Sequence, residues 1–355
     1  WRDCYVAMAM CIEHTSRIRF GPCVTNPGVR EWSVAASLFA ALALQSEGRF
    51  DIGLGRGDSS LRVMGKRPAN LRSMVEFGQQ VKAMVRGEEV TYPDCPSSVK
   101  FPWAAGHELP LWIAAYGPKA LKSAGEFGDG LILQIAEPEI CRWLATQARR
   151  AGQARGRDMS NYRVMAAAPA FVGPMDVCIE KTRWFPAMVG NHIAEIVERY
   201  GADSNALPRS LSAYVKNRRG YDYSKHGQSD NPYLDFITPD VVESFGVLGS
   251  VEQHVAKLRQ LEAAGVTQFN IYLENGEIIR SKPERTYPQV INFNIESLLD
   301  GSPDENIILQ NWDIVLIRQN PNFRSPSKVS IMGEVKVPGI YTLQKKWETL
   351  ENILN

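Results

Sequence analysis

Apolar and polar positions follow two alternating patterns along residues 1–275. Short, nearly continuous apolar runs are typical of strands buried on both faces of a sheet, and apolar residues spaced by three and four are typical of helices. Runs of the two kinds alternate, which predicts a parallel sheet covered by helices. The expected strands are 17–25, 49–57, 109–115, 129–135, 162–172 and 266–273, and the expected helices are 31–46, 70–85, 118–127, 138–150, 177–200 and 251–264.

Two architectures fit this alternation. A closed (β/α)8 barrel needs eight parallel strands, two more than the pattern supplies, and an open doubly wound sheet is the alternative. Residues 205–239 are rich in Tyr, Gly, Asp and Pro without a regular period. We expect a long loop there, near a site.

The pattern changes after residue 276. Helical spacing gives way to short strand-like runs, and Lys336-Val337-Pro338-Gly339 has the composition of a turn between two of them. We therefore predict a first domain over 1–276 and a small, mostly β region that divides into 277–320, a linker over 321–328 and a further segment over 329–355. The strand-like runs are 289–293, 307–309, 314–317, 329–335 and 340–343.

Composition and charge exclude several classes of protein. The 40 Lys and Arg residues balance 39 Asp and Glu residues, so nothing in the net charge of +1 indicates nucleic acid or an anionic membrane as partner. The longest apolar run, 32–46, is about five residues too short for a bilayer span.

Six scattered cysteines without a CxxC pair suit a reducing cytoplasm, the expected location. The chain starts at Trp1, which indicates an incomplete gene product.

The strongest candidate site lies where residues 49–57 end. Gly53, Gly55 and Gly57 are spaced by two, and Asp58 and two serines follow. Glycines let a backbone approach a ligand closely, and the amides that follow can bind an anion or a ring carbonyl. The spacing differs from the dinucleotide fingerprint, and a tight turn without ligand is the alternative.

A second candidate follows the strand expected over 109–115. Tyr116 and Gly117 precede Pro118, which suits the first position of a helix, and Lys119 adds a positive charge. Free amides at a helix N-terminus bind phosphate, and in barrels such sites lie at the carboxyl ends of strands. An ordinary loop with Lys119 in solvent is the alternative.

The remaining candidates are weaker. Cys23 could act as a nucleophile, but the sequence places no basic partner beside it, so a small buried residue is favoured. The five histidines have no metal-ligand spacing, and we expect no metal. Basic and tyrosine residues over 216–225 favour a solvated loop over a surface for an acidic tail or nucleic acid.

Four stretches taken together resemble the luciferase-like monooxygenase superfamily, especially its deazaflavin- and flavin-dependent oxidoreductases. They are HTSRIRFGPCVTNP (14–27), GRFDIGLGRGDS (48–59), LPLWIAAYGPKALKSAGEFGDGLIL (109–133) and FGVLGSVEQHVAKLRQLEAAGVTQFNIYL (245–273). The resemblance implies a (β/α)8 barrel of TIM type with coenzyme F420 or FMN at its C-terminal face. The cofactor would supply the hydride chemistry or activate oxygen, acting on a small organic substrate. A homo-oligomer is possible.

The resemblance also implies roles for individual residues. Cys23-Val24 falls where many members hold a cis peptide bond against the ring, with Thr25 next to it. Asp58 falls where relatives often carry an acid beside the reacting centre, and we take it as the catalytic candidate. The cofactor-binding candidates are Cys23, Val24 and Thr25 at the first strand end, Gly55, Arg56 and Gly57 along the ring, and Tyr116, Gly117, Pro118 and Lys119 at the phosphate.

The chain departs from the family pattern in two ways. The six strands would be the third to the eighth of the barrel, so the first two are expected to be absent. In relatives the second of these carries aromatic and histidine groups beside the substrate, and we therefore expect the activity to be impaired. The last region resembles the β-grasp repeats of polysaccharide export proteins, which are periplasmic, in RTYPQVINFNIESLLDG (285–301), ENIILQNWDIVLI (305–317) and VSIMGEVKVPGIYTL (329–343). We therefore expect a chimeric reading frame joined near 273–280.

Three functions remain open at this point. The leading one is a flavin- or deazaflavin-dependent oxidoreductase of luciferase-like type. The second is a non-enzymatic envelope component for polysaccharide export, carried by the β-grasp region. The third is a barrel of another chemistry that uses the same phosphate site for a sugar phosphate.

Overall fold

The structure is a computed structural model that divides into two units, Trp1–Leu273 and Glu274–Asn355. We describe each unit by itself. The residues described are 3–190 apart from positions 94, 105 and 107, then 234 and 237–272; in the second unit they are 277–280, 289–292, 307, 314–316, 328–331 and 339–342.

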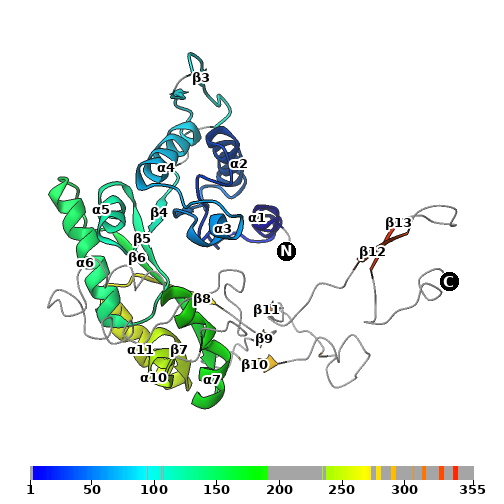
Figure 1. The fold of residues 1–355 in the computed structure, drawn as a ribbon, viewed down its shortest axis with the longest axis vertical. Helices are drawn as coiled ribbons and strands as arrows, with labels where there is room; N and C mark the ends of the chain where they lie inside the picture. The colour runs from blue at the N-terminus through cyan, green and yellow to red at the C-terminus, as the bar shows by residue number, and fades with distance from the viewer. Residues whose placement is uncertain are drawn as a thin grey trace. The chain divides into compact units, whose positions relative to one another are not determined.

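The first unit is built on a curled, six-stranded parallel sheet of the TIM-barrel type (Figure 1). Its path runs β1-β4-β5-β6-β7, and β8 pairs with β6. Short apolar runs form the strands because both faces of the sheet are covered. The strands are β1 (Ile52–Leu54), β4 (Leu111–Ala114), β5 (Gly130–Leu133), β6 (Arg163–Val172), β7 (Val247–Gly249) and β8 (Gln268–Tyr272), and a separate hairpin pairs β2 (Val90–Thr91) with β3 (Ser98–Val99).

The register of the strands brings their carboxyl ends to one edge. Leu54 pairs with Ile113 of β4, and Leu131 of β5 pairs with the same residue. Met165 of β6 pairs with Ile132 on one side and with β8 on the other, so β6 lies between β5 and β8. Residues that follow β1, β4 and β5 in the sequence are therefore neighbours in space.

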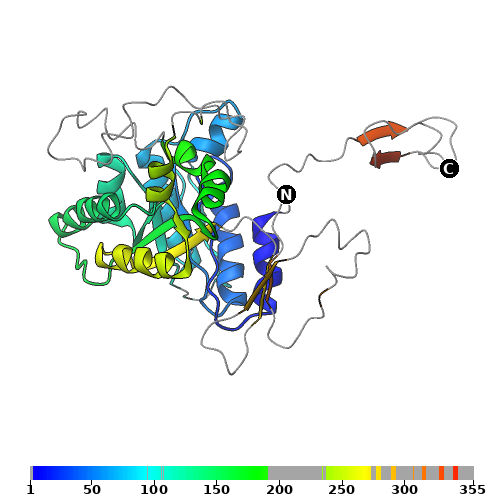
Figure 2. The same cartoon turned by 90° about the horizontal axis from the view of Figure 1, so that it is seen from below.

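Helices cover the outside of this sheet, as two perpendicular views show (Figures 1 and 2). Pro118 opens one helix at its first position, and Ser250 with Gln253 forms a capping box at another. The helices of the described residues include α1 (Cys4–Glu13), α2 (Trp32–Gln45), α3 (Asp58–Val63), α4 (Leu71–Val85), α5 (Pro118–Phe127), α6 (Pro138–Ala154), α7 (Met175–Thr182), α10 (Pro239–Phe245) and α11 (Val251–Ala263).

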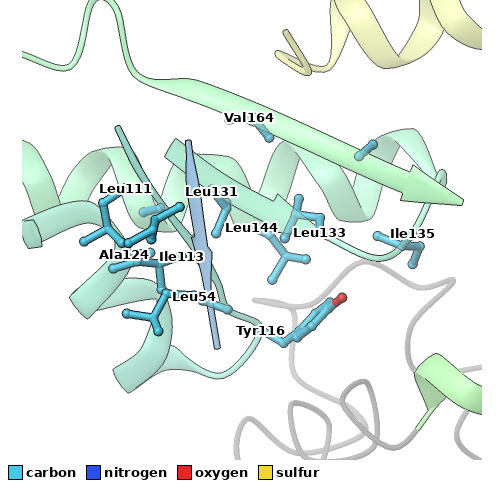
Figure 3. Close-up of a cluster of buried hydrophobic side chains, with 14 of the residues drawn as sticks. Leu54, Leu111, Ile113, Tyr116, Ala124, Leu131, Leu133, Ile135, Leu144 and Val164 are labelled. Carbon is cyan, nitrogen blue, oxygen red and sulfur yellow. The ribbon is translucent and has the colours of Figure 1, made fainter. Parts of the chain in front are cut away.

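The core lies between the sheet and this helical layer. Figure 3 shows Leu131 and Leu133 of β5 gathered with Leu144 of α6, and these three side chains are fully buried. A smaller cluster of Trp112, Ile132 and Met165 is buried separately from this main core. Alternate residues of β4 and β5 thus enter different clusters, as expected for strands buried on both faces.

Two elements of the first unit differ from the expectation. The strand predicted over 17–25 is wrong: this segment makes only two isolated parallel bridges, Phe20 to Phe50 and Thr25 to Leu54. Between them stands Pro22, which has no amide to donate to a ladder. The sequence pattern also missed β7, which is only three residues long, too short for a periodic signal.

Helices were predicted well where they are long. Five of the six expected helices appear within four residues of their expected ends, but α1, α3 and α10 were missed. The helix expected over 177–200 begins as α7, and residues 191–200 lie outside the described part of the chain, as does most of the loop expected over 205–239.

The described residues of the second unit form two small antiparallel sheets. In one, β9 (Glu277–Arg280) pairs with β10 (Gln289–Asn292) and β11 (Ile314–Leu316), and in the other β12 (Lys328–Ile331) pairs with β13 (Gly339–Thr342). Four of the five expected strand-like runs coincide with these strands; Ile307 is described without regular structure. The linker expected over 321–328 lies almost wholly outside the described residues.

Candidate active site

A cavity of about 290 Å³ opens at the carboxyl edge of the sheet. Gly55 follows β1, Ala115 follows β4 and Gln134 follows β5, and all three line it. This is the end of a barrel-type sheet at which ligands bind, because loops with different side chains meet there. The volume is close to the lower end of the range for small-molecule pockets, about 300–1,000 Å³.

One wall of the cavity is built from glycines packed on the segment 22–26. A carbon attached to Gly53 would lie 2.1 Å from the carbonyl oxygen of Pro22, and one on Gly55 would lie 2.9 Å from a methyl group of Val24. Gly57 has a positive φ of 79°, and a carbon there would lie 2.6 Å from the side chain of Asn26. We call Gly53, Gly55 and Gly57 with the segment 22–26 the glycine wall.

The glycine spacing predicts close approach of the backbone to a ligand, whereas the structure shows close approach to the segment 22–26. Each glycine faces a different residue of the segment 22–26, which runs parallel to it in steps of two. The missing side chains make room for protein, and Gly55 and Gly57 also line the cavity. A Cβ at Gly53 would push the two backbone segments apart, and one at Gly55 would displace the side chain of Val24.

The peptide bond between Cys23 and Val24 is cis, as the family resemblance implies. Val24 is 38% exposed although it is apolar, and it lines the cavity beside Gly55. Neighbouring groups crowd the thiol of Cys23, and this loss of solvation raises its pKa, against a hydrogen bond with Asn270 that lowers it. Cys23 itself is exposed, so the small buried residue expected at this position is wrong. Its raised pKa keeps the thiol protonated near neutral pH, and a protonated thiol is a poor nucleophile.

The opposite side of the cavity is the N-terminus of α5. Gly117 is the N-cap and has no side chain to bond the first-turn amides, and the first turn contains no acidic residue. Gly117, Lys119 and Ala120 line the cavity. Uncapped amides, the positive end of the helix dipole and the ammonium of Lys119 together favour an anion at this position.

Tyr116 and Gln134 line the cavity, and Tyr272 bonds to Gln134 from outside the lining; we call these three residues the tyrosine wall. The amide of Gln134 donates to the hydroxyl of Tyr116 at 2.5 Å, and its side-chain nitrogen donates to the hydroxyl of Tyr272 at 3.0 Å. Burial raises the pKa of Tyr116 well above 10 and that of Tyr272 to about 12. Both phenols are therefore uncharged at neutral pH, and this wall holds its shape without a net charge.

Asp58 is the carboxylate on the cavity lining. It is the first residue of α3, its side chain is 22% exposed, and one oxygen lies 3.7 Å from the guanidinium of Arg62. Beside it, the side chain of Arg56 donates to the carbonyl of Ala69 at 2.8 Å, and Ala69 donates back to the carbonyl of Arg56 at 2.9 Å. This reciprocal pair fixes the loop before α4 to the edge of the cavity.

The structure gathers nine of the eleven candidate residues on this one lining. Pro118 opens α5 but does not line the cavity, and Thr25 is 4% exposed and bonds to β1 through its backbone. The roles assigned to the eleven stay predictions. The residues brought together are Cys23, Val24, Gly55, Arg56, Gly57, Asp58, Tyr116, Gly117 and Lys119.

Several lining residues were missed by the sequence analysis. Asn26 is 4% exposed and links two elements, donating to the hydroxyl of Ser60 and accepting from the amide of Gly28, both at 3.0 Å. The two serines after Asp58 and the polar Gln134 at the end of an apolar strand were the available signals. The missed residues are Asn26, Ser59, Ser60, Leu71, Ala114, Ala115, Ala120 and Gln134.

Two further observations bear on the chemistry. No group of three His, Cys, Asp or Glu side chains that could hold a metal ion occurs among the described residues. No helix in the part of the chain searched is long and apolar enough to cross a membrane.

Comparisons with known proteins place this geometry in context. The model of the luciferase-like monooxygenase family matches residues 1–268. A 5,10-methylenetetrahydromethanopterin reductase of Methanopyrus kandleri is 27% identical over 277 residues, which are 72% of this chain and 76% of the relative.

Two solved structures support the fold. The coenzyme F420-dependent tetrahydromethanopterin reductase of Methanopyrus kandleri superposes with a TM-score of 0.56 at 23% identity, covering 75% of this chain and 80% of that one. An F420-dependent secondary alcohol dehydrogenase superposes with a TM-score of 0.57 at 18% identity, covering 76% and 78%.

Proposed function

Because the chain belongs to the luciferase-like monooxygenase family, we propose that it is an oxidoreductase that binds the deazaflavin coenzyme F420 in the cavity at the carboxyl edge of its sheet. The observation that carries the proposal is the convergence of the glycine wall, the tyrosine wall and the N-terminus of α5 on one cavity. The relatives named above are F420-dependent enzymes or reductases, which favours F420 over FMN.

The residues present fit such a cofactor. Val24 and Gly55 offer a flat apolar surface for a ring, because no side chain projects from Gly55. The free amides of α5 and Lys119 suit the phosphate that F420 and FMN both carry. Gln134 and Tyr116 close the back of the cavity and exclude water there.

The bound cofactor would accept or donate a hydride, and the protein would position the substrate and manage the proton. Asp58 suits the proton role because its carboxylate lines the cavity while remaining partly exposed. Arg62, one helical turn away, would stabilise the carboxylate between transfers. The substrate is a small organic molecule.

The test is a titration of the full chain with F420 and with FMN. The turnover rate of the Asp58→Asn variant is then compared with that of the wild type. We expect saturable binding of F420, weaker binding of FMN, and for the variant unchanged F420 affinity with turnover lowered about 100-fold or more. Asp176→Asn, in the first turn of α7 and outside the cavity lining, is the matched control and should keep full turnover. If neither cofactor binds, the proposal fails.

The remaining predictions about partners and location rest on the sequence. A cytoplasmic location, self-association and the absence of a nucleic acid partner all stay predictions. So does the resemblance of residues 285–343 to β-grasp repeats, because the family match ends at residue 268. We propose no separate function for the second unit.

A further inference from the structure

A group of unpaired basic residues lies beside the cavity. Residues 59–75 contain four basic side chains and no acidic one. Three of them, Lys66, Arg67 and Arg72, are exposed and have no ion pair or side-chain hydrogen bond with any described residue. We call these three residues the cationic ridge.

Six cations elsewhere in the described part of the first unit stand in ion pairs. Lys82 lies 2.7 Å from Asp129, Arg86 lies 2.6 Å from Glu88, and Lys122 lies 3.3 Å from Glu126. Arg72 is also placed against the preference of its own helix, because it stands in the first turn of α4, where a positive charge is unfavourable and which contains no acidic residue. Residues that depart from the local preferences of their secondary structure are expected at functional sites.

The ridge is attached to the cavity by specific contacts. The reciprocal hydrogen bonds between Arg56 and Ala69 fix the loop that carries Lys66 and Arg67. Leu71, next to Arg72, lines the cavity itself. A molecule bound in the cavity and extending past Leu71 would therefore leave it beside the residue that precedes Arg72.

We propose that the cationic ridge binds an anionic extension of the cofactor, namely carboxylate groups beyond the phosphate. This inference rests on the proposed function. Coenzyme F420 carries glutamyl carboxylates beyond its phosphate, whereas FMN ends at its phosphate. The ridge thus distinguishes the two cofactors by charge, while α5 and Lys119 serve the phosphate that they share.

The test compares two triple variants of the full chain without substrate. Lys66→Gln/Arg67→Gln/Arg72→Gln removes the ridge, and Arg150→Gln/Arg155→Gln/Lys181→Gln removes three exposed cations elsewhere, none of which lines the cavity. Each variant is titrated with F420, with the deazaflavin riboside that lacks the phosphate and the tail, and with FMN, at several salt concentrations.

We expect the ridge variant to bind F420 about tenfold more weakly at low salt, with a shallower dependence on salt, and to bind FMN and the riboside as the wild type does. The control variant should match the wild type for all three. Unchanged F420 affinity in the ridge variant, or an equal loss for FMN and F420, would overturn this inference while leaving the proposed function standing. If the wild type binds no F420, both proposals fail.

Discussion

The two walls of the cavity are held in place by opposite means. The glycine wall is fixed by close contact between two segments, because an added carbon at Gly53 would meet the Pro22 carbonyl and one at Gly55 would meet a methyl group of Val24. The tyrosine wall is fixed by two tyrosine hydroxyls: that of Tyr116 accepts from the backbone amide of Gln134, and that of Tyr272 accepts from the side-chain nitrogen of Gln134. Adding an atom should therefore damage the first wall most, and removing one should damage the second.

The largest effect is expected at the glycine wall. Gly53→Ala places a methyl group against the Pro22 carbonyl, a backbone atom that cannot turn aside, and we expect a loss of about 3 kcal/mol in the free energy of unfolding. At Gly57 an alanine would contact Asn26 and would also have to adopt the positive φ of 79°, which is strained for any residue with a side chain. Denaturant unfolding measures both variants.

Gly48→Ala is the matched control for Gly57→Ala. The two glycines have φ values of 80° and 79°, but nothing lies within 4 Å of an added carbon at Gly48. We expect Gly48→Ala to cost about 1–2 kcal/mol from backbone conformation alone. If Gly57→Ala costs no more than Gly48→Ala, contact with Asn26 does not constrain the glycine wall.

A smaller effect is expected at the tyrosine wall. Tyr116→Phe removes the acceptor of the Gln134 amide and leaves a buried donor unsatisfied, at a cost of about 1–3 kcal/mol. Thermal unfolding measures this cost. The comparison is Tyr162→Phe, which removes a hydroxyl that donates to the Ala124 carbonyl outside the cavity. Cofactor affinity should fall for Tyr116→Phe only; an equal fall in both variants would contradict a local role for this wall.

The tyrosine wall also predicts a pH dependence. Burial raises the pKa of Tyr272 to about 12, so above pH 10 the unfolded chain loses this proton first and stability falls as the pH rises. From Tyr272 alone the free energy of unfolding at pH 11 should be about 1.4 kcal/mol below its value at pH 8. Urea unfolding at the two pH values, repeated on Tyr272→Phe, should give a smaller difference in the variant. A difference that is unchanged would refute the assignment to Tyr272.

The smallest effect is expected at Cys23. Its raised pKa keeps the thiol protonated near neutral pH, so it should take no part as a nucleophile. Cys23→Ala should therefore keep turnover within about threefold of the wild type. Loss of turnover with unchanged cofactor affinity would instead give the thiol a chemical role.

The comparison also explains what the sequence could and could not predict. Long helices such as α4 and buried strands such as β5 were found because their apolar spacing repeats over enough residues. The strand expected over 17–25 was wrong because apolar content cannot reveal that Pro22 and a close glycine partner prevent a regular ladder. Tertiary contact decided its structure.

The candidate site was predicted better on one wall than on the other. The glycine spacing and the Pro118 helix start are local signals, and they located Gly55, Gly57 and Gly117 on the lining. The tyrosine wall joins residues 116, 134 and 272, which are far apart in the chain. No local pattern can predict that Gln134 bonds Tyr272.

The most direct test of the proposed function is a crystal structure of the full chain with F420 bound. We expect the deazaflavin ring in the cavity next to Val24 and Gly55, and the phosphate at the N-terminus of α5 beside Lys119. Density for the cofactor elsewhere on the chain, or in the cavity with its phosphate away from α5, would contradict the proposed site.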